Sequence, residues 1–309
     1  MKCTRCGRDS VIELKHSKEH LCRNCFIGSF EKRVRKTIRT NQLLKGTDNI
    51  CVALSGGKDS AVVLYMLHEI TKTRPNSELM AITIDQGIEG SQKSLAAAGC
   101  LCKKLGVKQY EYSFREEYGY TMDEIVRKNL GRKSPAPPCS YCGILRRRLL
   151  NTKAKELGAT KIATGHNLDD EIQASLMNYV RGDLERIARM GAVVGVVRDA
   201  GFILRIKPLR DSPENEVRLY AELKKLPFES SRCPYSGEAF RRTIREAMEK
   251  IDEKHPGSKF QILKSTDQLI ALLRKCEKPE KIGKCGVCGD PSSRPVCRCC
   301  EIKEKLGMR

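Results

Sequence analysis

Residues 51–60 have the sequence CVALSGGKDS, and three patterns meet there. An apolar run over residues 50–54 is typical of a buried parallel strand, and apolar residues at helical spacing follow over residues 61–67. Glycines between a strand and a helix let the backbone approach a ligand, and a helix N-terminus presents unpaired N–H groups to an anion. The stretch therefore predicts a strand, a phosphate-binding loop and a helix, with Lys58 adding a full positive charge.

The hexapeptide SGGKDS, residues 55–60, is not a Walker loop, because it lacks the four residues between the first glycine and Gly-Lys-Ser/Thr. It resembles the pyrophosphate loop of the N-type ATP pyrophosphatases. That resemblance implies cleavage of ATP between its α and β phosphates and transfer of AMP to an acceptor oxygen. The alternative is a glycine-rich turn with a capping serine and a solvated lysine.

The composition bounds the class of protein. The 309 residues can hold one sizeable α/β domain with small appendages. No stretch approaches the roughly 20 apolar residues of a membrane span, and the N-terminus has no apolar signal segment, so we expect a cytoplasmic protein without a membrane partner. The 58 basic against 38 acidic residues give a formal charge of +20, which favours a polyanionic partner; a lysine-rich soluble surface is the alternative.

The chain has sixteen cysteines, which we interpret as ligands or catalysts because disulfides do not persist in the cytosol. Two quartets have the paired Cys-x-x-Cys knuckles of four-thiolate zinc sites: Cys3, Cys6, Cys22 and Cys25 near the start, and Cys285, Cys288, Cys297 and Cys300 near the end. Cys299 is the alternative to a member of the second quartet. Cys297 and Cys300 are preferred because they keep the knuckle spacing.

Further strands are expected at residues 79–84, 108–114, 160–164 and 204–209, with helices between them. This alternation predicts a doubly wound parallel sheet with ligands at the carboxyl ends of its strands. Ile84, with its neighbours Thr83 and Asp85, falls near the expected adenosine side, although these can be ordinary strand residues. Ala53 and Gly165 are assigned to the same nucleotide site.

Three carboxylates, Asp169, Asp170 and Glu171, follow the strand at 160–164. Such groups can hold Mg²⁺ on phosphates or accept a proton, and they can also cap a helix. A phosphate loop in the same sheet favours the functional interpretation.

A third set of cysteines lies in the middle of the chain. Cys139-x-x-Cys142 follows three prolines and opens a helix that continues with arginines 146–148, so thiolates there would feel both the helix dipole and positive charge. The pair is therefore reactive or a ligand set. Cys233 precedes a proline, as iron–sulfur ligands often do.

Helical segments make up most of the remainder. Residues 26–44 predict a helix with one basic face, which is either a solvated surface or a track for an RNA backbone. Residues 181–200 have a loose pattern expected of a flexible segment near the active site. Residues 238–274 predict two helices with basic exposed faces.

These motifs together resemble, over nearly the whole chain, the tRNA 2-thiouridine synthetases of the TtuA/NcsA type. The resemblance implies a Rossmann-like α/β fold, in which the doubly wound parallel sheet of a PP-loop ATP pyrophosphatase is flanked by zinc ribbons at both ends and by extra helices. The implied domains are an N-terminal ribbon at 1–28, a basic linker helix at 29–47, a catalytic domain at 48–210, a helical extension at 211–276 and a C-terminal ribbon at 277–309.

The resemblance also implies an ATP-dependent tRNA uridine 2-sulfurtransferase, in which ATP adenylates the C2 oxygen of a uridine and sulfur then displaces AMP. Asp170 matches the family's catalytic acidic position, and Arg146 falls where the family often has lysine. The implied pyrophosphate ligands are Ser55, Gly56, Gly57, Lys58, Asp59 and Ser60. The implied cofactors are ATP, Mg²⁺, two Zn²⁺ and a 4Fe-4S cluster bound by Cys139, Cys142 and Cys233.

Several alternatives stay open on the sequence. Sulfur transfer can use the cluster or a persulfide on Cys142 or Cys233. The chain could instead be a tRNA-binding module with regulatory ATPase activity, whereas an amidating ligase would leave the ribbons and the charge unexplained. Wobble position 34 is slightly favoured over T-loop position 54. The sulfur donor is sulfide or a thiocarboxylated ubiquitin-like carrier, and a homodimer is expected from the family.

Overall fold

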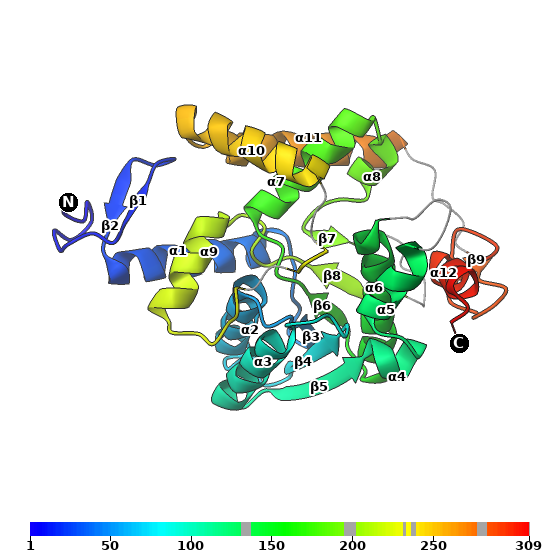
Figure 1. The fold of residues 1–309 in the computed structure, drawn as a ribbon. Coiled ribbons are helices and arrows are strands. Elements are labelled where there is room, and N and C mark those ends of the chain that lie inside the picture. The colour runs from blue at the N-terminus through cyan, green and yellow to red at the C-terminus, as the bar shows by residue number, and fades with distance from the viewer. Residues whose placement is uncertain (131–136, 195–201, 231–232, 236–238, 277–282, 309) are drawn as a thin grey trace.

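The structure is a computed structural model, and it describes residues 1–130, 137–194, 202–230, 233–235, 239–276 and 283–308. A central sheet carries helices on both faces, and the two chain ends lie on opposite sides of the molecule (Figure 1). No helix among these residues is long and apolar enough to cross a membrane.

The sheet has the strand order β5-β4-β3-β6-β8-β7. Its strands are β3 (Asn49–Ala53), β4 (Glu78–Asp85), β5 (Lys108–Ser113), β6 (Lys161–Ala163), β7 (Val193–Val194) and β8 (Leu204–Ile206). All neighbouring pairs are parallel except β7 and β8, which are antiparallel. The predicted α/β class with a parallel sheet is confirmed, and the structure adds an antiparallel edge strand.

Both faces of the sheet are covered, as its continuous apolar strands require. Ile50 and Val52 point into one core, which also contains side chains of α1 (Arg23–Thr40), α2 (Lys58–Thr71), α3 (Gln92–Leu105) and α9 (Glu214–Leu223). Cys51, between them, points into the opposite core. That core is completed by α4 (Phe114–Tyr118), α5 (Met122–Leu130), α6 (Pro138–Glu156) and α12 (Arg298–Leu306).

A third, smaller core lies beyond the sheet. Leu168 and Ile172 of α7 (Leu168–Arg181) pack with Met248 of α10 (Ala239–Lys254) and Leu263 of α11 (Ser258–Cys276). Figure 1 shows these helices stacked together above the sheet. The predicted pair of helices after residue 238 thus covers α7, whose first turn follows β6.

Each chain end forms a small ribbon. The N-terminal one pairs β1 (Ile12–Leu14) with β2 (Glu19–Leu21), and the C-terminal one pairs β9 (Gly283–Lys284) with β10 (Pro291–Ser292). Leu14 and Leu21 are buried in the same core as Phe26 of α1. The N-terminal ribbon therefore packs on the body of the protein through an apolar contact.

Two expectations need correction, and two short helices were not expected. The helix predicted over 26–44 begins at Arg23 and ends at Thr40. The segment 181–200 is not uniformly loose, because its described part contains α8 (Leu184–Ala188), started by the Asp183 side chain, and the strand β7. The short helices α4 and α5 were not predicted, since five and nine residues show too few helical repeats. The proline at 135 and residues 231–232 lie outside the described residues.

Candidate active site and metal centres

The site lies where the order of the sheet reverses. From β3 the chain proceeds through β4 to β5 on one side, and β6 then pairs on the other side of β3. The carboxyl ends of β3 and β6 therefore meet at a topological switch point, where α/β sheets bind ligands. Gly165 follows β6 and packs directly on the loop after β3: a Cβ atom there would lie 2.8 Å from the Ser60 nitrogen. Only glycine allows this approach.

The loop of residues 55–60 has the geometry of an anion cradle. Gly56 has φ +79°, and a Cβ on it would collide with the Ser94 carbonyl oxygen, so both its conformation and its surroundings require glycine. The Ser55 and Ser60 hydroxyl oxygens lie 3.1 Å apart, and the Ser60 hydroxyl donates to the Gly57 carbonyl at 3.0 Å. The N-terminus of α2, which begins at Lys58, completes the cradle.

Lys58 is held by two carboxylates. Its Nζ lies 2.8 Å from Asp59 Oδ2 and 2.9 Å from Glu214 Oε1, at the start of α9. Burial opposes the charge of Lys58, but Asp59 and Glu214 outweigh it and raise the lysine's pKa. Arg245 of α10 lies 3.6 Å from the other Glu214 oxygen. A cation is thus fixed at the loop, surrounded by groups that an entering phosphate could replace.

Asn167 ties the loop to the helix after β6. Its side chain accepts from the Asp170 N–H at 3.1 Å, and its own N–H donates to Asp170 Oδ2 at 3.3 Å, which is a capping box. Its amide also donates to Asp59 Oδ1 at 3.0 Å. Burial first, and the Asp59 and Glu214 charges second, raise the pKa of Asp170 to about 6. Asp170 is therefore a cap and also a carboxyl group that titrates near neutral pH.

The two neighbouring carboxylates serve other purposes. Asp169 accepts from Lys259 at 2.6 Å and from the Glu214 N–H at 2.7 Å, and so joins α7 to α9 and α11. Glu171 is buried with Lys207 at 2.7 Å. Of the three carboxylates considered from the sequence, Asp170 is the one whose charge is coupled to the loop.

The middle cysteines are gathered beside this site. Cys139 and Cys142 lie in the first turns of α6, and the Cys139 thiol donates to the Tyr235 carbonyl at 3.2 Å. The Tyr235 hydroxyl donates to Asp123 of α5 at 2.8 Å, which holds the segment containing Cys233 against the start of α6. These two hydrogen bonds join segments that are more than ninety residues apart in the sequence.

The same segment is bonded to the phosphate loop. The Glu229 N–H donates to the Gly56 carbonyl at 2.9 Å, four residues before Cys233. Burial is the main cause that raises the pKa of Cys142, the Cys233 and Cys139 charges add to it, and Arg146, one turn further along α6, opposes it. The structure thus places the phosphate loop and all three predicted cluster ligands at one edge of the sheet.

The two terminal quartets have the sulfur spacing of four-thiolate zinc sites. Zn–S bonds of about 2.3 Å at tetrahedral angles separate sulfur atoms by about 3.8 Å. Within each terminal quartet all four sulfur atoms lie within 4.8 Å of one another, with Cys6 to Cys22 at 3.5 Å and Cys288 to Cys297 at 3.8 Å. Among the described residues, Cys139, Cys142 and Cys233 do not form such a tight group.

The C-terminal quartet is supported by backbone and arginine donors. The Cys297 N–H donates to Cys285 Sγ at 3.2 Å and is the main cause that lowers the pKa of Cys285 to about 6. Arg148 of α6 donates to Cys300 Sγ at 3.7 Å and pairs with Asp290 at 2.9 Å. Cys299 is outside the quartet and is buried in the core beside α6.

The remaining predicted nucleotide residues lie at the expected strand ends. Ala53 ends β3 and is partly exposed, whereas Ile84, the penultimate residue of β4, is largely buried in the core with Ile88. Asp85 accepts from the Gly87 N–H at 2.8 Å and so shapes the turn after β4.

Sequence reasoning missed Glu214, Asn167 and the two arginines of α10 that reach the site. Arg245 approaches Glu214, and Arg241 lies 3.8 Å from Asp170 Oδ1. Glu214 had a usable signal, because it opens a helix after the last parallel strand of the sheet, at the edge where ligands bind. The arginines had none, since nothing in their spacing shows which helix they face.

Two family models match the chain. One, described as a PP-loop domain, covers residues 28–251, and the other, described as the N-terminal LIM domain of the 2-thiouridine synthetase TtuA, covers residues 2–27. The fold and the site thus define an ATP-binding protein of the PP-loop class.

Relatives that align with nearly the whole chain identify its family within the PP-loop class. The chain is 40% identical to the tRNA 2-thiolation protein NcsA of Haloferax volcanii, over 99% of both chains. It is 34% identical to the tRNA-5-methyluridine(54) 2-sulfurtransferase of Pyrococcus horikoshii, over 100% of this chain and 96% of that one. The solved U34-tRNA thiolase NcsA of Methanococcus maripaludis, which contains a 4Fe-4S cluster, is 37% identical with a TM-score of 0.84, over 99% of this chain and 96% of that one. The chain belongs to the tRNA 2-thiolation protein family, as the sequence motifs indicated.

Proposed function

We propose that the chain is an ATP-dependent tRNA uridine 2-sulfurtransferase. The observation that carries the proposal is the bond between Glu229 and Gly56, because it joins the phosphate loop to the segment of Cys233. Activation of an oxygen and delivery of sulfur must occur on the same atom of the substrate, so their groups must share one site. Family membership and the basic charge support tRNA as the substrate.

ATP activates the C2 oxygen by making it part of a good leaving group, AMP. The loop N–H groups, Lys58 and the hydroxyls of Ser55 and Ser60 bind the departing pyrophosphate. Phosphate oxygens replace Glu214 on Lys58, so the lysine is positioned before ATP enters. Stabilisation of charge by such preorganised donors is commonly the largest contribution to catalysis.

Asp170 and Asp59 supply the acidic side of the site. Oxygen ligands suit Mg²⁺, and Asn167 fixes both carboxylates relative to the loop. The raised pKa of Asp170 also suits a group that accepts a proton during activation of the uridine. Arg146 contributes charge alone, since an arginine does not release its proton.

Cys139, Cys142 and Cys233 would hold the iron–sulfur cluster. When bound by three thiolates, a four-iron cluster supplies one iron position without a protein ligand, at which sulfur can bind. The chain's own contribution is to fix the three thiols beside the loop through Tyr235 and Asp123. The alternative route, a persulfide on Cys142 or Cys233, would use the same thiols beside the loop.

Several finer assignments belong to the same proposal. The two quartets each bind one Zn²⁺, and the ribbons at 1–28 and 277–309 frame a catalytic domain at 48–210, with the helix at 29–47 and the extension at 211–276 completing it. Wobble uridine 34 is the preferred target, supported by higher identity to the U34 thiolase than to the position-54 enzyme. The protein is a cytoplasmic homodimer that takes sulfur from sulfide or a carrier protein.

Anaerobic reconstitution tests this function. Purified protein loaded with iron and sulfide is incubated with ATP, Mg²⁺, sulfide and unmodified tRNA, and the tRNA is digested to nucleosides for mass spectrometry. We expect 2-thiouridine with production of AMP and pyrophosphate. Transcripts with position 34 or position 54 changed to cytidine identify the target. Unchanged nucleosides with intact cluster and bound tRNA would leave only the binding-module alternative.

A further inference from the structure

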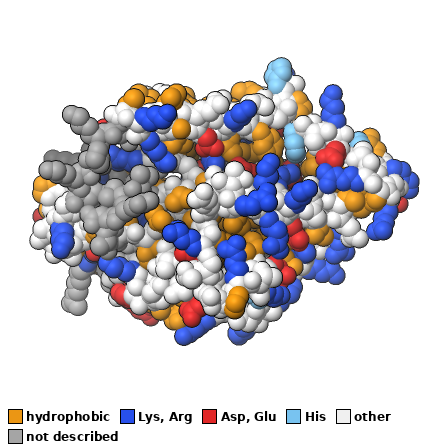
Figure 2. All heavy atoms as spheres, turned by 180° about the vertical axis from the view of Figure 1, so that it is seen from behind, with side chains coloured by type: hydrophobic (Ala, Val, Ile, Leu, Met, Phe, Trp, Pro, Cys, Tyr) orange, Lys and Arg blue, Asp and Glu red, His pale blue; other side chains and the backbone are white. Residues whose placement is uncertain are grey.

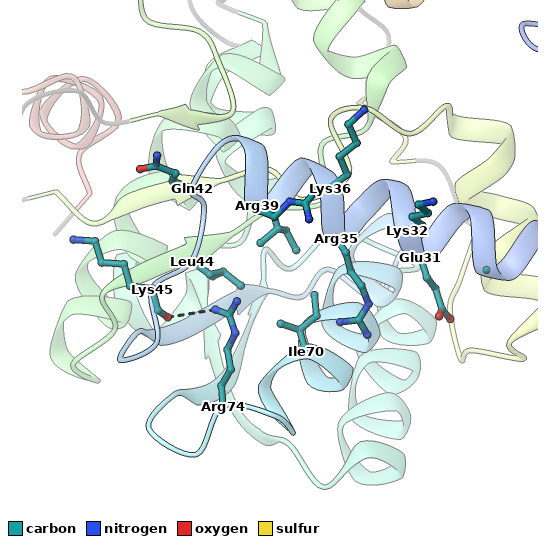
Figure 3. A pocket seen from close by; sticks show the side chains of 12 residues that line it. Glu31, Lys32, Arg35, Lys36, Arg39, Gln42, Leu44, Lys45, Ile70 and Arg74 are labelled. Atoms are coloured by element: carbon teal, nitrogen blue, oxygen red, sulfur yellow. Dashed lines mark hydrogen bonds between the residues drawn. The ribbon is translucent and has the colours of Figure 1, made fainter.

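A cavity of about 820 Å³ lies between α1, the turn after it and the end of α2, which we call the α1 groove. Six basic residues line it: Lys32, Arg35, Lys36, Arg39, Lys45 and Arg74. Figure 3 shows Arg35 and Arg74 extending into the space between the two helices. Figure 2 shows Lys and Arg side chains gathered on the side of the molecule opposite to that seen in Figure 1.

In the described part of the chain, none of the six basic side chains of the α1 groove forms an ion pair with a carboxylate. The one acidic residue of the lining, Glu31, is already engaged by Lys224 at 2.9 Å and by the Tyr220 hydroxyl at 2.8 Å. Arg33, on another face of the same helix, is by contrast paired with Glu216 at 2.7 Å. The groove therefore offers its charge to a ligand.

The pattern of the cations suits a chain of phosphates. Lys32, Arg35, Lys36 and Arg39 are spaced by three, four and seven residues, so they form one stripe of about 10 Å along α1. The floor beneath them is aliphatic, with Ile38, Leu44 and Ile70, and no aromatic residue lines the described cavity. The groove can therefore bind phosphates but has no platform on which bases could stack.

The α1 groove is too far from the phosphate loop for one nucleotide to contact both. The phosphate loop lies at the start of α2, and Arg74 follows its end, so about 20 Å of helix separates them. The loop occupies the carboxyl edge of the sheet, and the groove lies toward the opposite edge. An extended polyanion, by contrast, can contact both at once.

We propose that the α1 groove binds backbone phosphates of the tRNA, remote from the uridine that reacts, and contributes affinity without contributing to the rate of the chemical step. This inference rests on the proposed function for the identity of the RNA. It gives the basic face of α1 a role that the chemistry at the phosphate loop does not require.

The test compares two double variants that remove equal charge. Arg35→Gln/Arg39→Gln changes exposed groove residues, and Lys103→Gln/Lys108→Gln changes exposed residues of α3 and β5 outside it. Binding of unmodified tRNA is measured over a series of salt concentrations, together with the single-turnover rate at saturating tRNA. The groove pair should weaken binding roughly tenfold or more near physiological salt and flatten the salt dependence by about two phosphate contacts.

The expected pattern is weaker binding by the groove pair alone, with an unchanged single-turnover rate. Equal weakening by both pairs would overturn the inference, because it would reflect net charge only. Unchanged binding by the groove pair, with thiolation intact, would overturn it while leaving the proposed function standing. A change of sedimentation coefficient without tRNA, and no change in RNA affinity, would assign the groove to contact between two copies. If the unsubstituted protein itself does not thiolate tRNA, the result would count against the proposed function and not against the groove.

Discussion

Lys58 Nζ lies 2.9 Å from Glu214 Oε1, so the phosphate-loop lysine is held by a residue 156 positions away in the chain. The pair joins the start of α2 to the start of α9. The hydrogen bond to Glu214 fixes the position of the lysine amine. Asp59 and Glu214 also keep the lysine charged, because together they raise its pKa against the effect of burial.

Substitutions in the phosphate loop and in the set of three cysteines should impair different steps of the reaction. Lys58→Ala should reduce AMP formation by about 10²-fold or more, because it removes a charge that stabilises the departing pyrophosphate, while leaving iron content unchanged. Cys233→Ala should lose iron and thiolation but still bind ATP. AMP formation is followed with labelled ATP, iron content by elemental analysis, and ATP binding by calorimetry with a non-hydrolysable analogue. Cys100→Ala, at an exposed position of α3, is the control. Identical defects in the two variants would contradict this division.

Titration of Asp170 should appear as an acidic limb in the pH profile of kcat/KM. Its pKa is raised to about 6, so kcat/KM should rise with pH through about 6 and level off above it. Arg241 lowers that pKa, and Arg241→Gln should therefore move the limb to higher pH. A limb that does not move in this variant would remove Asp170 as its source.

The same shift should appear in stability. The native state binds the Asp170 proton more tightly than the unfolded state does, so this group's contribution is present at low pH and is lost as pH rises from about 4 to about 6. Urea unfolding of Asp170→Asn across this window should lack that contribution. The variant needs its Tm checked, because the capping box is also altered.

Serine substitutions at the adjacent residues Cys299 and Cys300 should have different effects on the zinc content of the protein. Cys300 belongs to the C-terminal quartet, whereas Cys299 is buried in the core beside α6. Cys300→Ser should lose one zinc per chain by plasma mass spectrometry, and Cys299→Ser should keep both. Arg148, which donates to Cys300 Sγ, lies on the helix of Cys139 and Cys142, so Cys300→Ser should also lower iron occupancy. Loss of zinc from Cys299→Ser would show that the quartet is assigned incorrectly.

Gly165 should be intolerant of a methyl group. Alanine there places Cβ 2.8 Å from the Ser60 nitrogen and would displace the phosphate loop, so Gly165→Ala should weaken ATP binding while the protein remains folded. Gly99→Ala is the matched control, because its Cβ would meet nothing closer than 3.7 Å. Equal ATP affinity in both variants would mean that the loop relaxes around the added atom.

Local patterns predicted the strands and the phosphate loop within a few residues, and they predicted the two terminal cysteine quartets that the structure brings together. The alternation of Ile50, Cys51 and Val52 between two cores explains why an apolar run without polar positions indicated a sheet covered on both faces. Knuckle spacing likewise separated Cys300 from Cys299, because two cysteines on one turn can reach an ion only at certain intervals.

Contacts between distant segments could not be predicted in this way. The contacts of Glu214 with Lys58, Arg241 with Asp170 and Tyr235 with Cys139 each depend on how distant helices and loops pack against one another. The short strand β7 and the helix α8 were missed for a related reason: two and five residues have no period of their own, and tertiary pairing determines their conformation.

In the proposed reaction, ATP transfers AMP to the C2 oxygen of the uridine, and this oxygen then departs with AMP. Thiolation in water enriched with heavy oxygen tests this order of events. If the uridine oxygen attacks ATP, the AMP formed with each 2-thiouridine takes its new oxygen from the tRNA and contains no heavy isotope. We predict unlabelled AMP in amounts equal to the 2-thiouridine formed. Heavy oxygen in that AMP would show that water, and not the uridine, attacked ATP, and would contradict the mechanism.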